Sequence, residues 1–178
     1  MKTRSIIIEG LDNCGKTTQI KNLVNFYNHI PYHVVHYSAL KHDSTEDCIK
    51  YNKQLYFELI NMASSFNCIF DRSHLGDWVF GYIYRKYDPS YIFDIEIQNH
   101  DLLDNISMIV FVDEPENAIA RDDGLSFSID LKQKQLEKDR FEEAYELSNI
   151  KNKTLINING LCEEAVFSKI AYFLEKPC

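Results

Sequence analysis

The sequence has little positive charge and no closely paired cysteines, and these two shortages exclude several classes of protein. It has 19 lysines and arginines against 27 aspartates and glutamates, for a formal net charge of −8. Because proteins that bind nucleic acid backbones usually have a basic face, this balance argues against broad attraction to DNA or RNA, although a local basic cleft is not excluded. The five cysteines are odd in number and form no Cys-x-x-Cys pair, so neither a disulfide framework nor a zinc site is indicated.

Long apolar runs, internal repeats and low-complexity linkers are also missing. The first four residues lead into only a few apolar residues before Glu9, too few for a signal peptide or a membrane span. With 178 residues, the chain fits one compact domain, 1–178. We therefore expect a soluble, cytoplasmic protein without a membrane partner, and a reducing environment fits the unpaired cysteines.

The most informative stretch is Gly10-Leu11-Asp12-Asn13-Cys14-Gly15-Lys16-Thr17-Thr18, which follows the apolar run Ile6-Ile7-Ile8. A glycine, four residues and then Gly-Lys-Thr is the spacing of a phosphate-binding loop (P-loop), because glycines let the backbone turn its N–H groups toward an anion. Lys16 is expected to reach the β- and γ-phosphates of ATP, and the Thr17 hydroxyl to bind Mg²⁺. The residues predicted to bind ATP are Gly10, Asn13, Cys14, Gly15, Lys16, Thr17 and Thr18.

Short β-rich runs alternate with amphipathic helical windows along the chain, which is the pattern of a parallel sheet covered by helices on both faces. The runs predict strands at 4–9, 32–38, 67–71, 106–113 and 153–158. Helices are predicted to begin inside the P-loop, at about 45–65, at about 131–148 and near the C-terminus. The predicted fold class is α/β, a P-loop NTPase three-layer sandwich.

Two of the predicted strands end in an aspartate, and ligands of such sheets lie beyond the carboxyl ends of the strands. Asp71 ends the third strand and Asp113 the fourth. Asp is a preferred N-cap residue, and Glu114-Pro115-Glu116 looks like a first helical turn, so Asp113 is interpreted as a helix cap. Asp71 is then the candidate that supports Mg²⁺ together with Thr17.

The segment 121–130 has no regular period and is predicted to be a mobile flap, or lid, at about 121–131. The helix predicted after it carries four cations, Lys132, Lys134, Lys138 and Arg140. Such a run is typical of a solvated helix face, but beside a phosphate site it would also suit closure over the phosphates.

In this order, the P-loop, the segment Asp71-Arg72-Ser73 and the Arg121 flap resemble the thymidylate kinase family of P-loop nucleoside monophosphate kinases over nearly the whole chain. The resemblance implies a five-stranded parallel sheet of order 2-3-1-4-5 and a homodimer. It also implies that Asp12 contacts the acceptor's sugar, that Asp71 acts on the Mg²⁺ shell and that Arg72 holds the acceptor phosphate.

The chain departs from the family at three places. Where the family commonly has an Arg-Glu-Pro-Gly-Gly stretch, the sequence has Tyr37-Ser38-Ala39-Leu40-Lys41, so one acceptor-binding arginine is missing. A tyrosine-glutamine pair that meets the thymine is replaced by Phe80-Gly81, which leaves stacking on Phe80 as the expectation. Asn13 stands where some members have an arginine, so Lys16 and the lid residue Arg121 are expected to offset the charge of the transferred phosphoryl group.

The stretch from Asp71 to Phe80 is also similar to the Glu/Asp-Arg-Ser segment of deoxynucleoside kinases and to small phage-encoded kinases, some of which act on modified pyrimidines within DNA. Kinases of a sugar hydroxyl need a carboxylate base after the second strand, where Asp43 is a nearby acid. A monophosphate acceptor needs no such base, because it is already a nucleophile at neutral pH.

Several side chains have two open interpretations. His74 either contacts substrate or is satisfied by backbone at a helix start, and Cys14 is either oxidisable or a small filler. An aromatic cluster either stacks on a base or packs in the core; its members are Trp78, Phe80, Tyr82, Tyr84, Tyr87 and Tyr91.

The sequence therefore predicts an ATP-dependent, Mg²⁺-requiring kinase of a pyrimidine deoxynucleoside monophosphate, such as dTMP or a modified analogue. Its acceptor-site candidates are Asp12, Arg72, Ser73 and Phe80. The alternative acceptor is a hydroxyl, in a deoxynucleoside or in a hydroxymethylated pyrimidine within DNA. A GTPase switch is disfavoured because Asn152-Lys153-Thr154-Leu155 lacks the acid of a guanine-reading motif. A non-catalytic nucleotide-binding module is disfavoured by the intact set Lys16, Thr17, Asp71 and Arg72.

Overall fold

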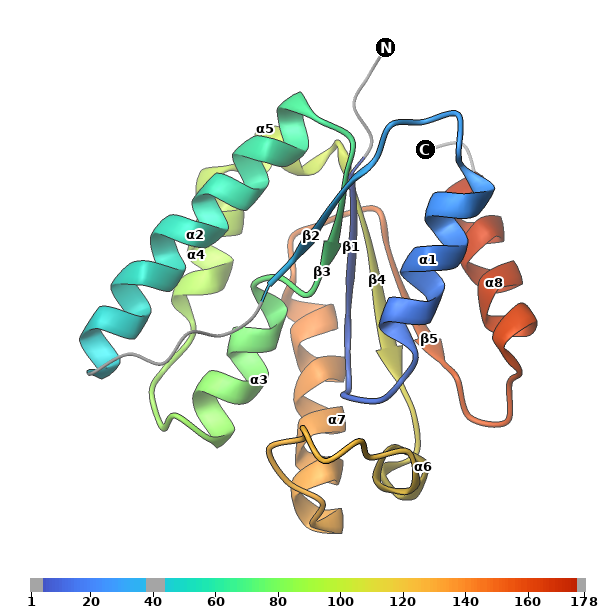
Figure 1. Cartoon of the computed structure of the whole chain (residues 1–178). Coiled ribbons are helices and arrows are strands. Elements are labelled where there is room, and N and C mark those ends of the chain that lie inside the picture. The colour runs from blue at the N-terminus through green and yellow to red at the C-terminus, as the bar shows by residue number, and fades with distance from the viewer. Residues whose placement is uncertain (1–4, 38–43, 176–178) are drawn as a thin grey trace.

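The computed structural model describes residues 5–37 and 44–175, and the part it describes is built on one parallel sheet. Its five strands lie in the order β2-β3-β1-β4-β5, as predicted (Figure 1). The strands are β1 (Ser5–Gly10), β2 (His33–His36), β3 (Cys68–Asp71), β4 (Ile106–Val112) and β5 (Lys153–Asn157). The predicted strand segments are confirmed to within two residues at each end, and residues 4 and 38 lie outside the described part.

The three inner strands are apolar along almost their whole length because both of their faces are covered. Every residue of β1, β3 and β4 is buried. The edge strands β2 and β5 are partly exposed. The core therefore lies around the inner strands, whose carboxyl ends all point to the same edge of the sheet.

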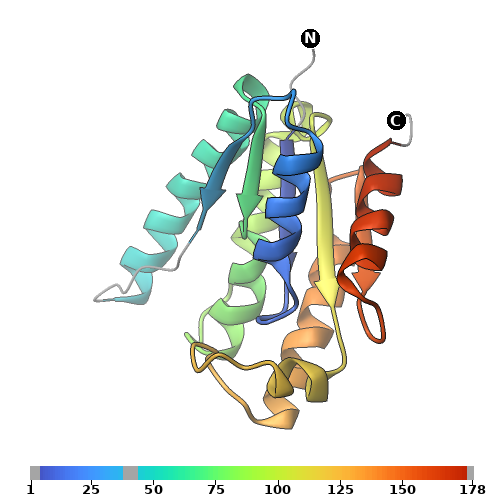
Figure 2. The ribbon, with the colours of Figure 1, turned by 45° about the vertical axis from the view of Figure 1, so that its right-hand side comes forward.

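Helices cover both faces of the sheet (Figures 1 and 2). On one face lie α1 (Lys16–Phe26) and α8 (Glu163–Glu175). The other face carries α3 (Leu75–Ile83) and α7 (Leu131–Leu147), with α2 (Thr45–Ser65) and α4 (Tyr91–Gln98) packed together beside them. Two short helices, α5 (His100–Leu103) and α6 (Pro115–Ala120), flank β4. None of the helices within the described ranges is long and apolar enough to cross a membrane.

The two longest helices begin at capping side chains, which explains why their starts were predictable. Ser44 accepts a hydrogen bond from the backbone N–H of Asp47 at the start of α2. Asp130 accepts one from the N–H of Gln133 at the start of α7. These caps satisfy N–H groups that have no partner inside the helix. Residues 121–130, which end at Asp130, form an irregular loop beyond the carboxyl end of β1, which we call the α6–α7 loop (Figure 2).

Gly10 ends β1 in a conformation that other residues rarely adopt. Its φ is +132°, and a β-carbon placed on it would lie 2.1 Å from the carbonyl oxygen of Phe111 in the neighbouring strand β4. Only a glycine therefore lets the chain leave the sheet here and enter the P-loop while β1 and β4 stay paired.

We expect Gly10→Ala to lower the free energy of unfolding by about 2–3 kcal/mol, because β1 and β4 must move apart to admit the methyl group. Urea-induced unfolding followed by circular dichroism measures this loss. Gly124→Ala is the matched control, since Gly124 also has a positive φ, of +81°, but nothing lies within 4 Å of its added β-carbon. Equal losses of unfolding free energy in the two variants would show that the contact with Phe111 does not contribute to the destabilisation.

Candidate active site

The P-loop joins β1 to α1 through two residues in the left-handed region of backbone conformation. Asn13 has a φ of 60° and Gly15 a φ of 76°, and α1 begins directly afterwards at Lys16. Asparagine and glycine are the residues that best tolerate this region. The resulting turn places the positive end of α1 at the carboxyl edge of the sheet, where an anion would be stabilised.

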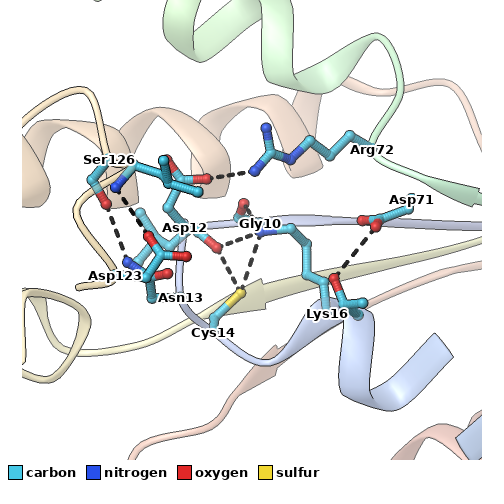
Figure 3. A network of polar contacts seen from close by, with 12 residues as sticks. Gly10, Asp12, Asn13, Cys14, Lys16, Asp71, Arg72, Asp123 and Ser126 are labelled. Atoms are coloured by element: carbon cyan, nitrogen blue, oxygen red, sulfur yellow. Dashed lines mark hydrogen bonds and ion pairs between the residues drawn. The ribbon is translucent and has the colours of Figure 1, made fainter. Parts of the chain in front are cut away.

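Lys16 is buried within this loop, with 6% of its surface exposed. Its Nζ donates hydrogen bonds to the backbone oxygens of Gly10, at 3.0 Å, and Leu11, at 2.6 Å (Figure 3). Sγ of Cys14 is a third partner, at 3.8 Å. All three acceptors belong to the loop itself, so the ammonium group is held within the loop through neutral partners. Its positive charge is not neutralised by these carbonyl groups.

A cavity of about 470 Å³ opens beside the P-loop. Most of the residues predicted to bind ATP, metal or the acceptor line it together: Asp12, Asn13, Gly15, Lys16, Thr17, Thr18, Asp71, Arg72 and Arg121. His36 and four residues of the α6–α7 loop, Asp123, Leu125, Ser126 and Phe127, complete the wall. Gly10 and Cys14 do not line this cavity, and Ser73 and Phe80 line a second one.

Thr17, Asp71 and His36 meet at one point of the P-loop cavity. The Thr17 hydroxyl lies 3.5 Å from Oδ2 of Asp71, and Nδ1 of His36 lies 2.9 Å from the same oxygen. Parallel pairing of β2 with β3 sets His36 opposite Asp71, a neighbour that sequence reasoning missed. The other carboxylate oxygen of Asp71, Oδ1, is buried and accepts no hydrogen bond. A hydroxyl beside a carboxylate that still has one unsatisfied oxygen fits the oxygen ligands that Mg²⁺ prefers.

Asp113 is not the helix cap that the sequence suggested. The cap position of α6 is Glu114, and Asp113 lies one residue earlier, fully buried. Its carboxylate accepts hydrogen bonds from the backbone N–H of Glu114 and the side chain of Asn117, and it pairs with the Arg121 guanidinium. Asp113 therefore positions Arg121, because a buried carboxylate needs a charged or hydrogen-bonding partner.

Arg121 and Asn13 attach the α6–α7 loop to the P-loop. Arg121 Nε donates to the backbone oxygen of Asn13 at 3.0 Å. The Asn13 amide in turn donates to Asp122 at 3.2 Å. It also donates to Ser126 at 3.1 Å (Figure 3). Asn13, at the position where the sequence comparison expected an arginine in some kinases, thus contacts the α6–α7 loop directly. Its position in the sequence did not indicate this role.

Arg72 stands between the P-loop cavity and a second cavity. Its guanidinium donates to Oδ1 of Asp12 at 2.9 Å (Figure 3), and its backbone adopts a left-handed φ of 72°. The second cavity has a volume of about 30 Å³. Its lining consists of Tyr37, Tyr56, Arg72, Ser73, Gly76, Asp77, Phe80, Arg85 and Phe127. Arg72 and Phe127 belong to the walls of both cavities.

Asp77 forms the polar floor of the second cavity. Its buried carboxylate accepts hydrogen bonds from Arg85 at 3.0 Å, from Asn52 at 3.2 Å and from the hydroxyls of Tyr87 and Tyr91. Sequence reasoning did not single out Asp77 or Arg85. The signal was an acid in the first turn of an otherwise apolar helix, and burying such a group requires several partners.

The aromatic cluster divides between the core and the second cavity. Tyr87 and Tyr91 are buried beside Asp77, and Trp78 packs against Phe93 and Arg140. Tyr82 also lies against Arg140. Only Phe80 and Tyr84 stack on a residue of the α6–α7 loop, Phe127.

The structure answers the two questions that the sequence left open for His74 and Cys14. His74 is buried, and its ring nitrogens contact Ser73 Oγ at 3.0 Å and Glu96 Oε1 at 2.7 Å, so side chains rather than backbone satisfy it. Burial alone would raise the pKa of Glu96, but the bond and charge of His74 and the donors of Asn149 and Ser148 hold it below its ordinary value. Burial raises the pKa of the Cys14 thiol, which favours the small-filler interpretation.

The cations of α7 do not reach the P-loop cavity. Lys134 is buried against Glu137 at 2.9 Å, and Lys138 pairs with Glu114 at 3.0 Å. Arg140 pairs with Glu143 and covers the ring of Trp78. Lys132 is exposed and lies outside the lining of either cavity. Of the flap cations considered from the sequence, Arg121 is the one that lines the P-loop cavity.

Comparisons with known proteins agree with this architecture. No protein-family model matches the sequence, and no curated protein matches it. Solved structures do match. Thymidylate kinase from Candida albicans superposes with a TM-score of 0.69 at 13% identity, over 98% of this chain and 92% of that chain. The YorR protein from Bacillus subtilis, solved with phosphorylated GDP, gives 0.71 at 17% identity, over 96% and 95%. Deoxyadenosine kinase from M. mycoides, solved with dATP, gives 0.62 at 19% identity, over 97% and 100%. The chain therefore has the fold of P-loop nucleoside and nucleotide kinases.

Proposed function

We propose that the protein is an ATP-dependent kinase that transfers the γ-phosphate to a pyrimidine deoxynucleoside monophosphate. The observation that carries the proposal is the pair of adjoining cavities with Arg72 in the wall between them. One cavity has the P-loop, Lys16 and the Thr17–Asp71 pair, and the other has an aromatic wall and a polar floor. Transfer between two bound substrates requires such adjacency, because catalysis of phosphoryl transfer depends mainly on positioning and on charge.

Each group of the P-loop cavity has a role in this proposal. The backbone of Asn13 to Thr18 and the start of α1 bind the phosphates of ATP, and Lys16 stabilises the charge of the transferred phosphoryl group. Arg121, held by Asp113, adds a second positive charge. It belongs to the proposed lid at about 121–131, which corresponds to the α6–α7 loop. In this proposal the whole chain, 1–178, is one domain.

Thr17 and Asp71 are the residues that would hold Mg²⁺. Within residues 5–37 and 44–175, no group of three or more His, Cys, Asp or Glu side chains could hold a metal ion without other ligands. This agrees with Mg²⁺ sites in kinases, which use one or two side chains together with the substrate's phosphates. When bound there, Mg²⁺ would neutralise charge on the phosphates.

The second cavity is the proposed acceptor site. Arg72 is expected to leave Asp12 for the acceptor's phosphate, which offers a bidentate partner, while Asp12 meets the sugar. Phe80 supplies a face for the base, and Ser73, Asp77 and Arg85 surround its edge. The neighbours solved with nucleotides support a nucleotide acceptor in general, and the pyrimidine and the monophosphate are our own choices within that class.

The test is ATP consumption with Mg²⁺ against three acceptor classes: deoxynucleoside monophosphates, deoxynucleosides, and DNA with ordinary or hydroxymethylated pyrimidines. Turnover with a pyrimidine monophosphate is the expected result. Turnover only with nucleosides or DNA would identify a hydroxyl acceptor instead, for which Asp43, outside the described residues, is the base suggested by the sequence. The absence of acceptor-dependent turnover throughout the panel would refute a kinase of these acceptors.

Arg72→Ala should raise the KM for a monophosphate acceptor about 10- to 100-fold while the KM for ATP changes little, because the lost charge faces the acceptor side. Steady-state kinetics with each substrate varied in turn measures both constants. Arg72→Lys serves as the comparison, since it keeps the charge and loses the planar fork, and an intermediate KM is expected. An unchanged acceptor KM in Arg72→Ala would remove Arg72 from the acceptor site.

Two further predictions from the sequence are kept as part of the proposal. The family resemblance implies a homodimer, and the cysteine usage implies a cytoplasmic location.

A further inference from the structure

The ring of Phe127, on the α6–α7 loop, lies where the base of an acceptor would stack. It is 5.4 Å from Phe80 between ring centroids, with 28° between the ring planes, and 4.9 Å from Tyr84, with 19° between the planes. We propose that Phe127 occupies the base-stacking position of the acceptor site in the free protein, and that the acceptor's planar base displaces it. This inference rests on the proposed function, since it concerns the acceptor cavity of that reaction.

Phe80 and Tyr84 form a stacking surface that Phe127 already covers. Their own rings are 6.2 Å apart and inclined by 22°, so both present a face in nearly the same direction. Phe141 packs its edge against Phe80, with 5.9 Å between centroids and 75° between planes. With Phe127 on its open side, Phe80 keeps only 8% of its surface exposed. A base therefore gains access to Phe80 only when Phe127 moves.

The volume of the acceptor cavity leads to the same conclusion. Its volume is about 30 Å³, enough for about two water molecules. A pyrimidine base with its sugar is far larger than that. Five residues of the cavity wall lie outside helices and strands: Tyr37, Arg72, Ser73, Arg85 and Phe127. The backbone N–H groups of the first four donate hydrogen bonds, whereas within the described residues no backbone hydrogen bond is found for Phe127, so Phe127 has the fewest backbone restraints among them.

Phe127 is held loosely enough to be exchanged for a ligand. Despite two ring contacts, 55% of its surface is exposed, whereas a phenylalanine of the core is nearly fully buried. A nucleobase offers the same flat face and adds polar edges that can reach Asp77 and Arg85. Base–aromatic stacking is of similar strength to stacking between two aromatic side chains, so the exchange loses little and opens the cavity.

Displacement of Phe127 should also change the affinity of the P-loop cavity for ATP. The residue before it, Ser126, accepts a hydrogen bond from the Asn13 amide of the P-loop. Phe127 itself lines both cavities. A base that moves Phe127 therefore moves a loop attached to the phosphate-binding residues. By thermodynamic reciprocity, the acceptor and ATP should change each other's affinity by the same factor, and this factor should approach one when the ring is removed.

The test compares Phe127→Ala with wild type by calorimetric titration of thymidine monophosphate and thymidine in the absence of ATP. We expect about tenfold tighter acceptor binding by Phe127→Ala, since the base no longer competes with two ring contacts. Phe127→Tyr, which keeps the ring, should bind as wild type does. Ile129→Ala is the control from the same loop, because Ile129 is 62% exposed and lies outside both cavity linings.

The sign of the change separates this inference from a structural role. If Phe127 only supported the cavity, its removal would weaken binding, and weaker or unchanged affinity in Phe127→Ala overturns the inference. Failure of every tested compound to bind either protein overturns it as well. The proposed function is judged separately, by turnover of the wild type with ATP. A wild type without turnover refutes that function, whereas the affinity difference between Phe127→Ala and wild type still decides the inference.

Discussion

Replacement of Lys16 by alanine is expected to lower kcat by a factor of about 10²–10³, the usual cost of removing one preorganised charge from a transition state. The structure supplies the physical reason. Lys16 is buried in the P-loop and makes its hydrogen bonds to neutral carbonyl oxygens, so its charge is available to phosphate groups in the adjoining cavity. The measurement is single-turnover and steady-state kinetics with the acceptor that shows activity in the panel.

Two controls make the Lys16 result interpretable. Lys21→Ala removes an exposed lysine from the same helix and should leave kcat unchanged. Urea unfolding of Lys16→Ala should show that the protein remains folded, although the carbonyls of Gly10 and Leu11 lose the Lys16 ammonium group as a donor. Turnover within threefold of wild type in Lys16→Ala would mean that Lys16 does not act on the transferred phosphoryl group.

The second large effect is expected for Asp71→Asn, which should raise the Mg²⁺ concentration for half-maximal rate by about 10- to 100-fold. Asp71 has one carboxylate oxygen that is buried without a hydrogen-bond partner and another beside the Thr17 hydroxyl. An amide keeps the shape of the side chain but removes the negative charge that a hard divalent cation prefers. The rate is measured as a function of Mg²⁺ at fixed, saturating substrate concentrations.

Asp113→Asn is the matched control, because Asp113 is the other acid at the carboxyl edge of the sheet. Its oxygens are taken by Glu114, Asn117 and Arg121. Loss of its charge should loosen Arg121 and change kcat, while the Mg²⁺ requirement stays as in wild type. If the Mg²⁺ requirement shifted in Asp113→Asn and not in Asp71→Asn, the two acids would exchange roles.

The sheet was predictable because its signals are local. The apolar runs of β1, β3 and β4 are continuous, and both of the longest helices start at a capping side chain, so their boundaries can be read from a few neighbouring residues. The order of the strands came from the family resemblance. The region 72–105 was less predictable, since Asp77, Tyr87 and Tyr91 are polar or amphipathic residues whose burial depends on one another and not on a periodic pattern.

The same distinction applies to the candidate site. The P-loop was found because its residues are contiguous and because their spacing follows from the backbone geometry that phosphate binding requires. Asn13 with Ser126, Asp113 with Arg121 and Phe80 with Phe127 are contacts between distant segments, and nothing in the sequence indicates which side chain faces which. The Asp113 cap was misplaced by one residue because an aspartate before a proline-containing helix start has the same local pattern whether it caps the helix or binds an arginine.

The backbone of Arg72 has a consequence for how this protein can change over evolutionary time. A left-handed conformation at a residue that is not glycine costs about 1–3 kcal/mol, and such residues concentrate at functional sites. Glycine would relieve that cost here, but it would remove the guanidinium that faces Asp12 and both cavities. If Arg72 binds the acceptor as proposed, selection for thermal robustness and selection for acceptor recognition act in opposite directions at this one position. Gains in robustness have to arise elsewhere in the chain for as long as the arginine is kept.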